Sequence, residues 1–113
     1  YMAMGDRKAA EAAYAESLRI TEALVAEFPG DDDMVRDLSV SYERSGDTLV
    51  ADGNQAGALE SYGKALAIRE ELAARDPENT LRQRDLSVTY ERIGDTNSLL
   101  GDSESALLAQ QAL

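Results

Sequence analysis

The sequence predicts an all-α fold built from repeated antiparallel helix pairs. The composition is rich in Ala, Leu, Glu and Arg, which lose little rotamer freedom in a helix. Apolar residues recur three and four positions apart, and the whole pattern repeats at an offset of 48 residues. The 113 residues suffice for one domain with a modest core.

The helices are predicted at about 7–28, 33–52, 55–75, 80–100 and 103–113. The second helix follows from a stripe at spacings of four, three and four, which begins at Leu38 and ends at Leu49. Gly53 is expected to end that helix, and Asn54 to cap the next one. Pro77 disfavours helical geometry in the residue before it and therefore stops the third helix. The carboxylates of residues 31–33 are expected to cap the second helix, since they lack the ligand spacing of a calcium loop.

The repeat is carried by long stretches of matching residues. Residues 36–48 read RDLSVSYERSGDT and residues 84–96 read RDLSVTYERIGDT, so that 11 of 13 positions match. Five further pairs of identical residues keep the same offset: Tyr14 and Tyr62, Leu18 and Leu66, Ile20 and Ile68, Leu24 and Leu72, Pro29 and Pro77. Because Gly5, Gly53 and Gly101 also lie 48 apart, three copies are expected to begin in this chain.

The unit resembles the tetratricopeptide repeat (TPR), whose signature has large, small and aromatic residues at set positions and a closing proline. The matching residues of the first complete copy are Tyr42, Ser45-Gly46, Leu49, Ala58, Tyr62 and Pro77. The next copy offers Tyr90, Ile93-Gly94 and Ala106, with departures at Asn97 and Gln110. The unit is 14 residues longer than the usual 34, and the extra residues extend both helices beside one turn. The resemblance implies a right-handed α-solenoid of antiparallel helix pairs, a TPR-like superhelix.

The expected domain organisation is a single array fragment over residues 1–113. It divides into the end of a first repeat at 1–30, a complete repeat at 31–78 and an incomplete repeat at 79–113. Neither end carries the polar capping element that repeat arrays need, so we expect a piece of a longer array. Gly46, Gly94, Ala58 and Ala106 are expected where helices approach closely, and Tyr42, Tyr62 and Tyr90 in the core.

The composition excludes several classes of function. With 22 acidic and 11 basic residues, the formal charge of −11 would repel nucleic acids and anionic membranes. The absence of Cys and His removes the usual zinc sites, thiol nucleophiles and catalytic triads. We therefore expect no catalytic residue, cofactor or metal, and no enzyme. No apolar run approaches the ~18 residues of a membrane span, and the compartment stays open, with the cytoplasm favoured.

One polar stripe is the candidate binding surface. The spacing of four, three and four aligns each of two sets on one helix face: Arg36, Val40, Glu43, Asp47 and Arg84, Val88, Glu91, Asp95. The TPR resemblance implies that this face lines a concave groove that binds peptides. Two interpretations stay open. The stripe is either an acidic surface facing the ligand, or it belongs to structural ion pairs, Arg44 with Asp47 and Arg92 with Asp95.

The predicted function is a non-catalytic protein-interaction scaffold within a larger multidomain protein. The ligand is expected to be a peptide or helix that carries Lys or Arg beside apolar anchors, because the stripe is acidic and contains two valines. The Lys and Asn with which some TPR proteins hold a carboxylate terminus are replaced here by Glu and Asp. The alternative is a structural spacer or self-association module that buries its open repeat ends against another copy.

Overall fold

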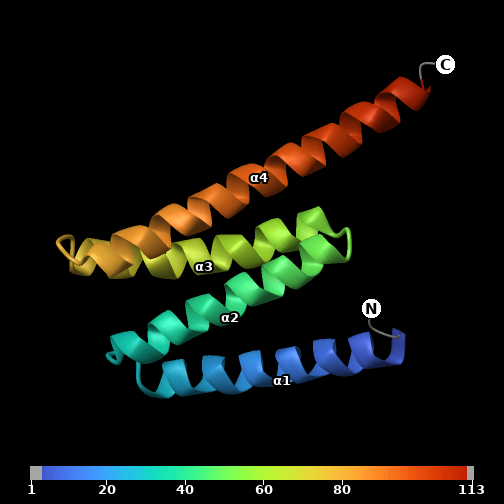
Figure 1. Cartoon of the computed structure of the whole chain (residues 1–113). Helices are drawn as coiled ribbons and strands as arrows, with labels where there is room; N and C mark the ends of the chain where they lie inside the picture. The colour runs from blue at the N-terminus through green and yellow to red at the C-terminus, as the bar shows by residue number, and fades with distance from the viewer. Residues whose placement is uncertain (1–3, 112–113) are drawn as a thin grey trace.

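The computed structural model describes residues 4–111 of the chain, and side chains within residues 8–101. Within that range the chain forms four α-helices and no strand, which confirms the all-α prediction. The helices are α1 (Met4–Glu27), α2 (Asp32–Ala51), α3 (Gln55–Arg75) and α4 (Thr80–Gln111), and each packs against the next along the chain (Figure 1). None of the helices within these residues is long and apolar enough to cross a membrane.

The turns around α2 form as the sequence predicts. The Asp31 carboxylate accepts hydrogen bonds from the backbone N–H groups of Asp33 and Met34, two of the amides that the first helical turn leaves unpaired. Gly53 has a φ of 83°, the left-handed conformation that glycine adopts without penalty. The Asn54 side chain then accepts from the N–H of Gly57 and begins α3. Capping therefore explains both ends of the turn between α2 and α3.

The core lies mainly between α2 and α3. Six apolar side chains are buried there: Leu38, Ala58, Tyr62, Ala65, Leu72 and Ala73. Gly46 of α2 lies against the ring of Tyr62, so that a Cβ at this position would meet three ring atoms at less than 3 Å. The close helix approach predicted at Gly46 and Ala58 is confirmed.

The third turn expected from the repeat does not form. α4 continues through Gly101 to Gln111, so the separate helix predicted at 103–113 is wrong. Glycine permits a turn but does not impose one. The turn at Gly53 is accompanied by burial of Tyr62 against α2, whereas the equivalent position after Gly101 is Gln110. Glutamine gains much less from burial than tyrosine, so the sequence offers little to fold residues 103–113 back on α4.

Other packing predictions hold for one copy only. A Cβ on Gly94 would meet nothing within 4 Å among the described atoms, so close packing at Gly94 is wrong for this part of the chain. Tyr90 is 52% exposed rather than buried, and Tyr42 is half-buried. The face of α4 that contains Gly94 has no helix of the described chain against it, which explains the open space at Gly94. Ala106 lies outside the residues whose side chains the structure describes.

Candidate interaction site

A buried arginine joins three helices. The side chain of Arg69 in α3 is 4% exposed, pairs with Glu43 of α2 and donates to Thr89 Oγ1 of α4 at 2.7 Å. It also donates to Ser39 Oγ of α2 at 3.1 Å. A guanidinium removed from water is costly unless it is paired and its N–H groups are satisfied, and these partners meet that need. Arg69 therefore fixes α2 and α4 relative to α3.

Two further ion pairs connect α2 directly to α4. Arg36 Nε lies 2.7 Å from Asp85 Oδ2, and this hydrogen bond raises the pKa of Arg36. Arg92 of α4 pairs with both Glu43 and Asp47 of α2, at 2.9 Å each. Glu43 and Asp47 of α2 are therefore neutralised by arginines of α3 and α4.

Tyr62 is held by the same cluster. Its hydroxyl donates to Asp47 Oδ1 at 2.5 Å, and its side chain is almost fully buried. Burial and the bond to Asp47 both raise the pKa of Tyr62 far above the ordinary value of about 10. The tyrosine is accordingly a neutral donor at any physiological pH.

The structure divides the eight predicted groove residues between two environments. Arg36, Glu43 and Asp47 of α2 take part in the ion pairs between helices. Val40 and Val88 are half-buried, while Arg84, Glu91 and Asp95 are exposed and form no ion pair within the described side chains. The eight residues thus do not form one continuous free surface.

The ion pairs cross between helices rather than run along them. Among the described residues, Arg92 pairs with Asp47, 45 positions away, and not with Asp95. Arg36 and Asp85 are 49 positions apart. Opposite charges separated by about one repeat length are the signal that would have identified these pairs, because equivalent helices of successive repeats lie side by side.

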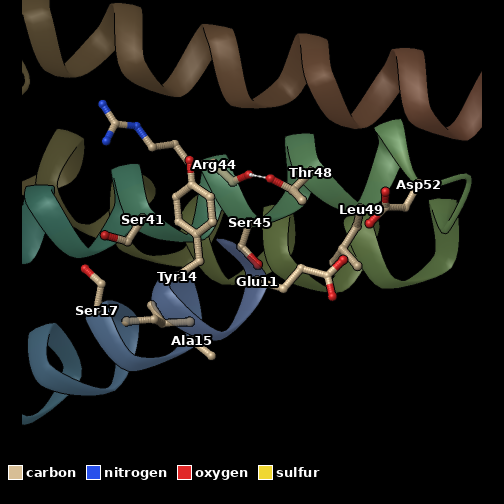
Figure 2. Close-up of a pocket in the computed structure, with 11 residues that line it drawn as sticks. Glu11, Tyr14, Ala15, Ser17, Ser41, Arg44, Ser45, Thr48, Leu49 and Asp52 are labelled. Carbon is tan, nitrogen blue, oxygen red and sulfur yellow. Dashed lines mark hydrogen bonds between the residues drawn. The ribbon is translucent and has the colours of Figure 1, made fainter. Parts of the chain in front are cut away.

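A groove with a mainly apolar lining lies between α1 and α2. It encloses about 300 Å³, and Figure 2 shows the Tyr14 side chain rising from α1 beside Arg44 and Ser45 of α2. The lining residues are Glu11, Tyr14, Ala15, Ser17, Leu18, Ser41, Arg44, Ser45, Thr48, Leu49 and Asp52. The lining combines apolar side chains such as Tyr14 and Leu18 with charged ones such as Glu11 and Arg44, a composition suited to binding a peptide or helix.

Sequence reasoning did not find this groove. Tyr14 is the repeat equivalent of Tyr62, yet Tyr14 is 49% exposed and Tyr62 only 2%. The difference arises because α2 lies over Tyr62, while no helix of the described chain takes the same position over Tyr14. Within the described residues, no cluster of three acidic side chains could hold a metal ion.

Comparison with known proteins adds no identification. The sequence matches no protein-family model, no curated protein and no solved structure.

Proposed function

We propose that this chain is a non-catalytic protein–protein interaction scaffold that receives a helix or peptide of its partner in the groove between α1 and α2. In this proposal the helices belong to a TPR-like, right-handed α-solenoid within a larger multidomain protein. The 48-residue repeat and the antiparallel pair formed by α2 and α3 support it. The alternative function is a structural spacer or self-association module with no peptide ligand.

The observation that carries the proposal is the different burial of two equivalent tyrosines. Tyr62 is covered by α2, and Tyr14, at the same position of the preceding unit, is open to solvent in the groove. The surface around Tyr14 therefore has the form of a face on which a helix packs, but without the helix. Exposed aromatic and leucine side chains beside charged groups are the usual anchors of helix recognition.

The expected ligand is an amphipathic helix. Its apolar residues would lie on Tyr14 and Leu18, which line the groove. Lys or Arg on the ligand would be favoured by Glu11 at the rim and by the net charge of −11. In this proposal the basic ligand expected from the sequence binds at the groove between α1 and α2, since Glu43 and Asp47 are already paired with arginines.

The test is a titration of the isotope-labelled chain with a designed helical peptide of Lys and Leu, followed by nuclear magnetic resonance. The amide signals of Ser41 and Ser45 are expected to shift. Tyr14→Ser should weaken binding by roughly tenfold, the loss typical of an aromatic anchor. The matched control is Tyr90→Ser, an equally exposed tyrosine outside the groove. Equal effects of the two variants, or shifts confined to Glu91 and Asp95, would contradict the proposal.

A further inference from the structure

The helix α1 has residues equivalent to those of α3 at the interface between α2 and α3. Ile20 and Leu24 lie 48 positions before Ile68 and Leu72 of α3. Leu72 is 3% exposed in the packing of α3 against its neighbours, whereas Ile20 is 49% and Leu24 40% exposed. Together with Tyr14, these residues give α1 the apolar face of α3 without a covering helix.

The helix α4 has residues equivalent to those of α2 at the same interface. Ser87, Glu91, Gly94 and Asp95 lie 48 positions after Ser39, Glu43, Gly46 and Asp47, which contact α3 from α2. All four residues of α4 are exposed. Because α4 runs straight through Gly101, as Figure 1 shows, the described chain does not turn back over this face.

The ion pairs inside the chain predict which charges would meet if α4 of another copy covered α1. In such a contact, α4 of the other copy takes the place of α2, and α2 of the first copy takes the place of α4. The pairs of Arg92 with Glu43 and Asp47 then correspond to pairs of Arg44 of the first copy with Glu91 and Asp95 of the other. The pair of Arg36 with Asp85 becomes Arg84 of the other copy with Asp37. These five side chains are Asp37, Arg44, Arg84, Glu91 and Asp95, all exposed.

None of these five side chains forms an ion pair within the described part of the chain. The contact of Tyr62 with Gly46 and Asp47 would also have an equivalent between the two copies. Tyr14, in the groove between α1 and α2, would lie on Gly94 of the other copy and donate to Asp95. Shape and charge are thus complementary at the same place.

We propose that the partner helix of the groove is α4 of a second copy of this chain, docked over α1 and α2 as α2 lies over α3 in a single copy. The inference rests on the proposed function, because it names the occupant of that site, but this occupant presents Glu91 and Asp95 to Arg44 of the groove instead of the Lys or Arg expected of a peptide ligand. The two surfaces differ, so the contact is head-to-tail, and further copies can add to the ends.

Three residue differences make this contact between copies weaker than the equivalent contact within one chain. Thr21 stands where α3 has Arg69, and the positions of Val35 and Val50 are taken by Gln83 and Ser98 in α4. The contact therefore lacks the buried guanidinium and two apolar side chains. We expect association that is reversible and depends on concentration and salt.

The first experiment exchanges charges between copies. In sedimentation velocity over a concentration series, the chain is expected to form species larger than a monomer. Arg44→Glu and Asp95→Arg should each weaken association by ~3- to 30-fold, because each places like charges opposite one another. In an equimolar mixture, contacts between unlike variants again bring opposite charges together, so the mixture should associate better than either variant alone. If the mixture associates no better than either variant, the proposal is wrong.

The second experiment uses a glycine that has open space in the single chain. Gly94→Leu should abolish association and leave the circular dichroism spectrum and the melting of the monomer intact. Gly63→Leu is the matched control, since a Cβ there also meets nothing within 4 Å and Gly63 lies outside the proposed contact. If Gly94→Leu associates as the unaltered chain does, or if it destabilises a monomeric chain because residues 103–113 fold back on α4, self-association by this contact is overturned.

The two proposals fail in different ways. A chain that stays monomeric at all concentrations but binds the Lys and Leu peptide in the groove overturns the second-copy partner alone. A chain that is monomeric and binds no peptide overturns both.

Discussion

The ring of Tyr62 packs directly on Gly46, and its hydroxyl is bonded to Asp47, the next residue of α2. One tyrosine therefore makes both an apolar and a polar contact across the α2–α3 interface. The apolar contact requires the absence of a side chain at position 46, and the polar one requires an acceptor at position 47. The equivalent pair in α4, Gly94 and Asp95, has no such tyrosine over it in the described chain.

Substitution of the two glycines should separate these environments. Gly46→Leu is expected to destabilise the fold by about 1–3 kcal/mol or more, because the new side chain overlaps the Tyr62 ring. Gly94→Leu should not destabilise the monomer, and it can stabilise α4 by up to ~1 kcal/mol since glycine is a poor helix former. Urea unfolding followed by circular dichroism at low protein concentration measures both. Similar losses for the two variants would show that Gly94 is covered, contrary to the structure.

The helices of the central repeat could be predicted from the sequence because their local signals agree. The Asp31 cap, the Gly53 turn and the stop before Pro77 each act within a few residues, so they needed no knowledge of tertiary packing. The copy at Gly101 could not be predicted in the same way. Its local sequence resembles that at Gly53, but whether a turn forms depends on the distant side chain that the turn would bury, and Gln110 replaces the tyrosine.

The candidate site was predicted less completely than the fold, for a similar reason. The stripe from Arg36 to Asp95 was correctly recognised as charged, but its partners lie on other helices about one repeat away. The spacing along the sequence suggests the pairs Arg44 with Asp47 and Arg92 with Asp95 within one helix, whereas the observed pairs join different helices. The groove at Tyr14 depends on which neighbouring helix is missing from the packing, and that information is not contained in the residues that line it.

Substitution by alanine is expected to change stability differently at Gly53 and at Gly101. Gly53→Ala should cost about 1–2 kcal/mol, because a residue with a Cβ is strained at a φ of 83°. Gly101→Ala should leave stability unchanged or raise it by up to ~1 kcal/mol, since Gly101 lies within α4 and its Cβ would meet no atom within 4 Å. Thermal unfolding of the two variants beside the unaltered chain provides the measurement. A large loss for Gly101→Ala would indicate a turn at that position.

Charge reversal should distinguish the paired acidic residues from the free ones. The Glu43 side chain is only 13% exposed and pairs with Arg69 and Arg92. Glu43→Lys would place a third positive charge beside two arginines, one of them buried. We expect a loss of about 3–5 kcal/mol, the usual result of breaking a buried ion pair.

Glu91→Lys is the matched control, because Glu91 is exposed and has no ion pair among the described residues. Its effect on the free energy of unfolding should lie within about 0.5 kcal/mol. Guanidinium chloride would screen the charges, so urea is the appropriate denaturant. If both variants are as stable as the unaltered chain, the ion pairs of Glu43 contribute nothing to the fold.

Alkaline pH should destabilise the fold through Tyr62. Burial and the bond to Asp47 hold its pKa far above the value of about 10 that applies in the unfolded chain. Below pH ~10 the hydroxyl is protonated in both states, and its contribution to stability is fully present. Above that pH the unfolded chain releases the proton and the folded chain retains it, so stability falls by at most ~1.4 kcal/mol per pH unit from this group.

The variant Tyr62→Phe isolates that contribution. At neutral pH it should be less stable by about 0.5–1.5 kcal/mol, since it loses the hydrogen bond to Asp47. Above pH ~10 it has no proton to release, so its stability should decline less steeply and approach that of the unaltered chain. Urea unfolding at a series of pH values from neutral to alkaline measures both slopes. Parallel declines of the two proteins would show that Tyr62 titrates alike in the folded and unfolded states, and that its bond to Asp47 does not hold the proton.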